Sequence, residues 1–238
     1  MKTQLPKVIL FDLDDTIISF SASSDTCWRE VCALYAGGAG IAPERLLAAI
    51  LESSQWYWGD AARHKRGRLN LRQGRRNVVA GAFQSLKITG SNLANEIADA
   101  FSDRRETSIS LFPGAVETLT SLRNRGIRLG LITNGDSEGQ RRKINTFGLE
   151  PYFDCILIEG ETGIGKPEPG VYELALQRLS IAPEEVWMVG DNLVWDIEAA
   201  QKAGILAVWV DFANRGLPAD SPIQPDRMIR SIAELVEE

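Results

Sequence analysis

Short apolar runs alternate with helical patterns in the second half of the chain. The apolar runs lie at 128–133, 155–158, 186–189 and 206–210. Apolar residues at helical spacing, or polar segments with helix-start signals, fill the intervals at 116–125, 137–146, 169–179 and 193–203. Strands that alternate with helices in this way predict a parallel sheet covered by helices on both faces.

A further apolar run, Val8–Phe11, begins the chain and predicts a strand buried on both faces. It is separated from the other strands by a long stretch without strand patterns. Within that stretch, helices are predicted from Asp25 to Ala36, from Pro43 towards Trp58, over 71–86 and over 91–104. We expect Gly37 and Gly38 to end the first of these helices. The predicted fold class is therefore α/β, with a Rossmann-like parallel-sheet core (1–19 and 111–238) and an inserted α-helical cap domain (20–110).

Composition narrows the classes of function. The 238 residues carry a formal net charge of -6, which argues against a general nucleic-acid binder. No run of about 18 apolar residues is present, so we expect no membrane span. Three cysteines and the absence of a secretory signal pattern predict a cytoplasmic protein. The oligomeric state stays open.

Polar residues whose side chains can bind ligands or take part in catalysis follow the predicted strands. They are Asp12 and Asp14 after the first strand, Thr133 and Asn134 after the second, Lys166 in the loop after the third, and Asp191 after the fourth. Because parallel strands end at one edge of the sheet, we expect these side chains to converge. Carboxylate oxygens suit a hard divalent cation, and a hydroxyl with an ammonium group suits a phosphoryl group. The pattern favours a metal-dependent phosphoryl-transfer site.

Each residue also has a simpler interpretation when it is taken alone. A lysine in a loop is usually solvated, and an aspartate after a strand is often a helix cap. The basic run from Arg63 to Arg76, which includes His64, is more typical of a solvated face than of catalysis. The aromatic cluster Trp56–Trp58 is more often part of a helical core than a stacking platform for a substrate.

The four motifs together resemble the haloacid dehalogenase-like (HAD) superfamily, and within it the phosphatases with a helical cap. The motifs are Asp12-Leu13-Asp14-Asp15-Thr16, Leu131-Ile132-Thr133-Asn134-Gly135, Lys166-Pro167, and Gly190-Asp191-Asn192-Leu193-Val194-Trp195-Asp196. The region from Thr133 to Trp209 is similar to nucleotide 5′-phosphatases and N-acylneuraminate-9-phosphatase. The resemblance covers essentially the whole chain and implies an Mg²⁺-dependent phosphatase of a small phosphorylated metabolite.

The resemblance also implies a role for each matched position. Asp12 is expected to be the nucleophile that forms an aspartyl-phosphate, and Asp14 the acid and base. Thr133 and Asn134 are expected to bind the phosphoryl oxygens, and Lys166 to steady Asp12. The expected Mg²⁺ ligands are a side-chain oxygen of Asp12, the backbone carbonyl of Asp14, and Asp191. Asp196 is expected to lie outside the ligand set, and Asp15 and Thr16 to shape the turn.

Three other functions remain possible from the sequence. A phosphomutase needs the same four motifs. A 2-haloacid dehalogenase needs the nucleophile but has no use for the acid at Asp14. A receiver-like signalling domain that stores phosphate on an aspartate also uses acidic residues, a threonine and a lysine, but the large insertion after Phe20 argues against it. Because this insertion interrupts the chain directly after the nucleophile strand, we expect it to act as the specificity element.

Overall fold

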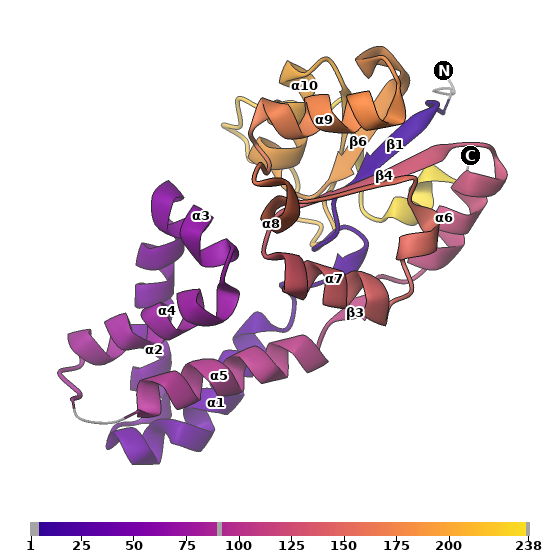
Figure 1. Cartoon of the computed structure of the whole chain (residues 1–238). Coiled ribbons are helices and arrows are strands. Elements are labelled where there is room, and N and C mark those ends of the chain that lie inside the picture. The colour runs from indigo at the N-terminus through magenta and orange to yellow at the C-terminus, as the bar shows by residue number, and fades with distance from the viewer. Residues whose placement is uncertain (1–4, 90–91, 237–238) are drawn as a thin grey trace. The chain divides into compact units, whose positions relative to one another are not determined.

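The computed structural model describes residues 5–89 and 92–236. The chain divides into two compact units. The core unit consists of Met1–Ser19 and Ser110–Glu238, and the helical unit of Phe20–Ile109 (Figure 1). The second unit is thus an insertion between Ser19 and Ser110 of the core unit.

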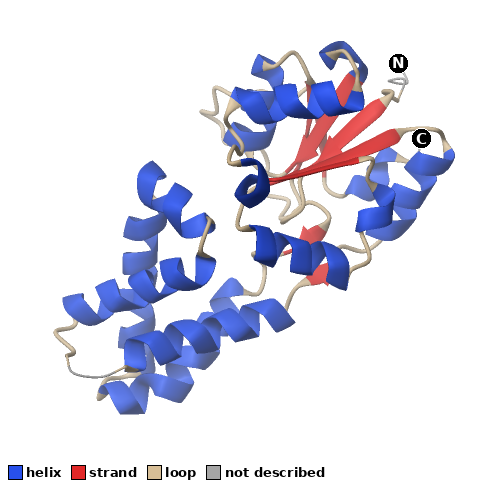
Figure 2. Ribbon diagram, in the orientation of Figure 1, coloured by secondary structure: helices blue, strands red, loops and turns tan. Residues whose placement is uncertain are grey.

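A six-stranded sheet, with every strand parallel to its neighbours, forms the centre of the core unit (Figure 2). In sheet order the strands are β5 (Cys155–Ile158), β4 (Arg128–Thr133), β1 (Val8–Phe11), β6 (Val186–Gly190), β7 (Leu206–Val210) and β8 (Arg227–Ile229). After β1, the chain adds β4 and β5 on one side of this strand and then β6, β7 and β8 on the other. This change of direction places a topological switch point between β1 and β6, where open α/β sheets bind their ligands.

Helices cover both faces of this sheet. They are α6 (Ala115–Asn124), α7 (Ser137–Thr146), α8 (Glu159–Thr162), α9 (Pro169–Leu179) and α10 (Ala199–Lys202), with short 3₁₀ turns η1 (Glu150–Tyr152), η2 (Pro183–Glu185) and η4 (Ile232–Leu235). Helix α9 packs on β4, β5 and α10, whereas α6 lies against β4 and η4 on the other face (Figure 1). The predicted α/β class with a parallel sheet is confirmed.

Strand β1 is buried on both of its faces, as its four apolar residues predict. Val8 and Leu10 join the hydrophobic cluster beneath α9, which includes Tyr172. Ile9 and Phe11 point to the opposite face, since side chains alternate along a strand, and both have no exposed surface. Full burial of β1 fixes its register against β4 and β6, and therefore fixes the position of Asp12, the residue that follows the strand.

The helix predicted over 193–203 differs from the expectation. Its first part, η3 (Leu193–Glu198), is a π-helix, and only Ala199–Lys202 is α-helical. The amides of Asp196 and Ile197 both donate to the carbonyl of Asn192, at 2.8 and 3.3 Å. The wider turn changes which side chains face the sheet, and π-turns of this kind recur at functional sites.

Five helices make up the described part of the helical unit. They are α1 (Ser24–Ala39), α2 (Pro43–Trp58), α3 (Ala61–Arg68), α4 (Leu71–Ser85) and α5 (Leu93–Thr107). The expected stop at Gly37 and Gly38 is wrong, because α1 continues to Ala39 and ends at Gly40 with a φ of 67°. Packing of α1 on α2 and α5 offsets the helix propensity lost at the two glycines, about 1 kcal/mol each. Helix α3 was not predicted.

The basic run and the aromatic cluster are divided between the interior and the surface of this unit. Lys65 and Arg66 are exposed, as expected for a solvated face, whereas Arg68 and Arg75 are buried. Tyr57 is buried, which agrees with a role in the helical core, whereas Trp56 is 63% exposed. The guanidinium carbon of Arg63 lies 3.7 Å from the centroid of the Trp56 ring.

Two short strands occur where the chain leaves and re-enters the core unit. Strand β2 (Ile18–Ser19) pairs antiparallel with β3 (Ser110–Leu111), so the ends of the insertion lie next to each other.

Within the described ranges, no helix has the length and apolar character needed to cross a lipid bilayer.

Candidate active site

The first part of the candidate site is the tight turn that follows β1. The amide of Asp12 donates to the carbonyl of Val189 on β6 at 2.9 Å, which extends the sheet pairing to the first carboxylate. The turn then closes through hydrogen bonds from the amides of Ile17 and Ile18 to the carbonyl of Leu13. Asp15 adopts a φ of 60°, a left-handed conformation that aspartate tolerates better than most residues. The turn presents the side chains of Asp12 and Asp14 from one short segment.

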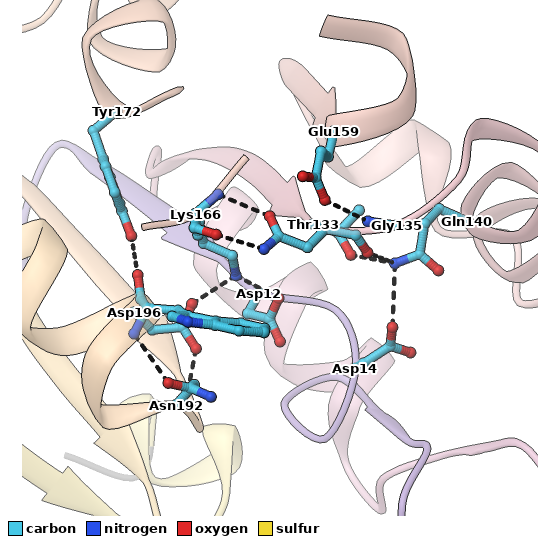
Figure 3. A network of polar contacts seen from close by, with 12 residues as sticks. Asp12, Asp14, Thr133, Gly135, Gln140, Glu159, Lys166, Tyr172, Asn192 and Asp196 are labelled. Carbon is cyan, nitrogen blue, oxygen red and sulfur yellow. Dashed lines mark hydrogen bonds and ion pairs between the residues drawn. The ribbon is translucent and has the colours of Figure 1, made fainter. Parts of the chain in front are cut away.

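Lys166 brings a buried ammonium group between Asp12 and Asp196 (Figure 3). Its Nζ lies 2.5 Å from Asp12 Oδ1 and 2.6 Å from Asp196 Oδ1, and the residue is 2% exposed. The loop that carries it is held by Asn134, whose side chain donates to the Lys166 carbonyl at 2.7 Å and accepts from the Lys166 amide at 2.8 Å. Lys166 is therefore not the solvated loop lysine that it resembles in isolation.

Three carboxylates gather around this ammonium group. One oxygen from each of Asp12, Asp191 and Asp196 lies within 4.8 Å of the others. Burial raises the pKa of Asp12 to about 7 against the opposing effect of Lys166, and burial together with the charge of Asp12 raises the pKa of Asp191 to about 9. Burial alone disfavours the charged form of Lys166, but Asp12 and Asp196 raise its pKa above the ordinary value. Because three acids, of which Asp12 and Asp196 are buried and Asp191 is half-buried, lie around one ammonium group, the donor set fits a hard divalent cation.

Asp196 contributes to this cluster from the π-helical turn. Its Oδ2 accepts a hydrogen bond from the amide of Asn192 at 2.9 Å, and its Oδ1 pairs with Lys166. A Cβ atom on Gly190 would collide with the Asp196 carboxyl group, so the approach requires glycine at that position. Both oxygens of Asp196 thus have protein partners. The helix cap here is Asn192, whose Oδ1 accepts from the amides of Val194 and Trp195, rather than Asp191.

Asp14 has a separate set of partners on α7. Lys143 Nζ lies 2.7 and 2.8 Å from its two carboxylate oxygens. Gln140 Nε2 donates to Asp14 Oδ2 at 3.1 Å, and the same nitrogen also contacts Thr133 Oγ1 and the Asn134 carbonyl. Figure 3 shows Asp14 beside Gln140 and away from the cluster around Lys166. Gln140 and Lys143 are not among the site residues predicted from the sequence.

A signal for these two residues does exist in the sequence. The segment 137–146 contains a single strongly apolar residue, Ile144, although it lies between two buried strands. Its buried positions are Gln140, Lys143 and Ile144, at the spacing of one helix face. A core helix whose inward face is polar and charged is a mark of a helix that covers a polar site.

The predicted site residues form two connected groups. Lys166 joins Asp12 to Asp196, with Asp191 beside them, and Gln140 joins Asp14 to Thr133. Asn134 contacts both groups, through its carbonyl and its side chain. The convergence at the ends of β1, β4 and β6 follows from the parallel sheet.

Comparison with known families agrees with this geometry. The model of the haloacid dehalogenase-like hydrolases matches residues 6–204. The chain belongs to this hydrolase family, as the four sequence motifs predicted.

Several curated relatives are phosphatases. The chain is 43% identical to phosphoserine phosphatase from Thermus thermophilus over 143 residues, or 60% of this chain and 56% of that enzyme. It is 28% identical to glyceraldehyde 3-phosphate phosphatase from Pyrococcus furiosus over 236 residues, covering 97% and 92% of the two chains. It is 35% identical to N-acylneuraminate-9-phosphatase from Rattus norvegicus over 157 residues, covering 65% and 62%.

Solved structures share the fold across nearly the full length. The putative HAD-hydrolase YfnB from Bacillus subtilis, bound to magnesium, superposes with a TM-score of 0.74 at 22% identity, covering 98% and 97% of the chains. A 2-haloacid dehalogenase from Pseudomonas syringae pv. Tomato has a TM-score of 0.64 at 28% identity, with 97% and 96% covered. The first likeness confirms the α/β core with a helical cap formed by α1–α5.

Proposed function

We propose that this chain is an Mg²⁺-dependent phosphatase that hydrolyses small phosphomonoesters through an aspartyl-phosphate on Asp12. The observation that carries the proposal is the pairing of Asp12 with Asp14 in one turn, each held by its own lysine. A nucleophile and an acid/base group two residues apart suit phosphoryl transfer, in which a leaving alcohol needs a proton and a water molecule needs a base.

Each residue then has a distinct task. The Asp12 oxygen attacks phosphorus, and Lys166 holds this carboxylate and balances the charge of the phosphoryl group. Asp14 protonates the leaving alcohol and later accepts a proton from water. Thr133 binds a phosphoryl oxygen, while Asn134 supports the Lys166 loop through its two side-chain hydrogen bonds.

The expected metal ligands are the Asp12 side chain, the Asp14 backbone carbonyl and Asp191. Bound Mg²⁺ would neutralise the repulsion between an anionic nucleophile and an anionic phosphoryl group. The excess of carboxylate groups over ammonium groups around Lys166 supports this assignment. Asp196 is proposed to remain outside the ligand set, because Lys166 and the Asn192 amide already engage its oxygens.

The substrate class is proposed to be a phosphate ester of a primary alcohol. Phosphoserine, glyceraldehyde 3-phosphate and N-acylneuraminate 9-phosphate, the substrates in the names of the relatives, all carry phosphate on a CH₂ carbon. The helical unit, Phe20–Ile109, is proposed to be the cap domain that selects among such esters.

Phosphate release from a panel of these three esters and the nucleoside 5′-monophosphates tests the proposal, with Mg²⁺ present and Asp12→Asn as the control. We expect release by the wild type and none by the variant. The similarity to a 2-haloacid dehalogenase makes hydrolytic dehalogenation the second candidate reaction. Chloride release from 2-chloropropionate would reveal it. Conversion of a sugar phosphate to its isomer without phosphate release would indicate a mutase. A phosphoenzyme that persists without turnover would indicate a receiver.

A further inference from the structure

Helix α7 holds the carboxylate of Asp14 from two positions. We propose that Lys143 and Gln140 are positioning residues that orient Asp14 for the hydrolysis of the aspartyl-phosphate. The inference rests on the proposed function and assigns its second chemical step to a specific pair of side chains.

Lys143 makes the stronger of the two contacts. Its ammonium group lies within 2.8 Å of both oxygens of Asp14, which fixes the plane of the carboxylate as well as its position. The two side chains are 10% and 24% exposed, so water competes weakly for the contact.

Gln140 links this carboxylate to the predicted phosphoryl-binding residues. Its Nε2 faces three oxygen acceptors, from Asp14, Thr133 and Asn134, and these determine the orientation of the amide. Because Nε2 can only donate, the Thr133 hydroxyl accepts from it and keeps its own proton for a phosphoryl oxygen. Gln140 is 3% exposed, and its Nε2 bridges Thr133 and Asp14.

Asp14 acts as a base in the step concerned. A water oxygen bonds to phosphorus, and the bond from phosphorus to the Asp12 oxygen breaks with its electron pair returning to Asp12. One proton of the water passes to Asp14. The products are phosphate, the Asp12 carboxylate and protonated Asp14. A base that is misplaced by about 1 Å can cost up to about 10²-fold in rate, so the contacts from α7 matter most here.

Steady-state and burst kinetics with p-nitrophenyl phosphate test the proposal. The p-nitrophenolate ion leaves without a proton, so formation of the phosphoenzyme needs no acid. We expect Lys143→Met to lower kcat by about 10–100-fold and to lower KM in parallel, so that kcat/KM is kept. A burst of p-nitrophenol equal to the enzyme concentration should precede the slow steady state. Lys143→Arg, which keeps a cationic donor, should restore part of kcat.

Arg142→Met is the matched control. It removes the same charge from the adjacent position of α7, where Arg142 is exposed and pairs with Glu138 at 2.8 Å. Both kinetic constants should stay at the wild-type values. Gln140→Leu provides a second test, which keeps the proposal testable if Lys143→Met does not fold. This variant should also lower kcat while kcat/KM is kept.

The possible results separate the inference from the proposed function. Equal loss of kcat and kcat/KM in Lys143→Met and Gln140→Leu, with no burst, would mean a merely structural role and would overturn the inference. Wild-type enzyme that releases no p-nitrophenol would instead refute the proposed function.

Discussion

Replacing Lys166 with methionine tests whether its ammonium group is the charge that makes the buried acidic cluster tolerable. The side chain is 2% exposed and its Nζ lies within 2.6 Å of oxygens of Asp12 and Asp196. Methionine fills a similar volume, so the change removes charge more than packing. Breaking a buried ion pair by removing one partner costs about 3–5 kcal/mol, and we expect that loss of unfolding free energy in EDTA at pH 8.

The size of the loss should depend on pH. Burial raises the pKa of Asp12 to about 7 in the folded protein, and loss of the opposing Lys166 charge raises it further. A carboxyl group whose pKa is higher in the folded state than in the unfolded state adds stability at low pH and loses it as the pH rises through the folded value. The unfolding free energy of Lys166→Met should therefore lie closer to the wild-type value at pH 5 than at pH 8.

Lys202→Met is the control for this experiment. Lys202 pairs with Glu198 at 2.7 Å, a similar distance, but its side chain is 70% exposed. Exposed pairs contribute about 0–1 kcal/mol, so this variant should be nearly as stable as the wild type. Urea denaturation in EDTA, with hydrogen exchange of the β1 amides to identify the transition of the core unit, measures both changes. Equal effects of the two substitutions, or a larger deficit at pH 5, would refute the reasoning.

Three further predictions follow from the site. EDTA should abolish turnover. Asp191→Ala should raise the Mg²⁺ concentration for half-maximal activity by about tenfold or more, since it removes a proposed carboxylate ligand. Calorimetric titration with Mg²⁺ checks the affinity, and an unchanged value would exclude Asp191 as a ligand. Asp14→Asn should reduce kcat/KM for an alkyl phosphate about 10²–10⁴-fold but leave kcat/KM for p-nitrophenyl phosphate near the wild-type value. Equal losses of kcat/KM for the two substrates would contradict an acid role. Trp56→Ala and Arg63→Ala in the helical unit should change the preference among phosphomonoesters more than the hydrolysis of p-nitrophenyl phosphate, and a common factor for all substrates would argue against a specificity role.

The sheet was predictable because its strands are buried on both faces. The apolar runs of β1, β4, β5, β6 and β7 have no polar interruption, and their bounds agree with the structure to within one residue. Strand β8 was missed because it has only three residues and follows a polar loop at the sheet edge. The helix end expected at Gly37 was wrong because tertiary packing outweighed local propensity.

The candidate site was predictable only where sequence position determines spatial position. Asp12, Thr133 and Asp191 follow strands, so the parallel sheet brings them together. The partners of Asp14 lie 126 and 129 residues further along the chain, on α7, whose polar composition indicates that it covers a polar site but does not indicate which side chain faces Asp14. The buried contacts of Asp196 depend on the π-turn of η3, which a helical period of 3.6 residues does not anticipate.

The central place of β1 in the sheet has a consequence for how the protein is made. A ribosome synthesises β1 before its partners β4 and β6, which begin only at Arg128 and Val186. The four apolar residues of β1 therefore stay unpaired until β4 has been made, whereas the helical unit, whose contacts are more local, is complete before either partner strand. We expect pulse-labelled hydrogen exchange during refolding to protect α1–α5 before β1, and simultaneous protection would argue against this order. Early folding of the insertion would then bring its two ends together. This would shorten the loop that must close before β1 can pair with β4.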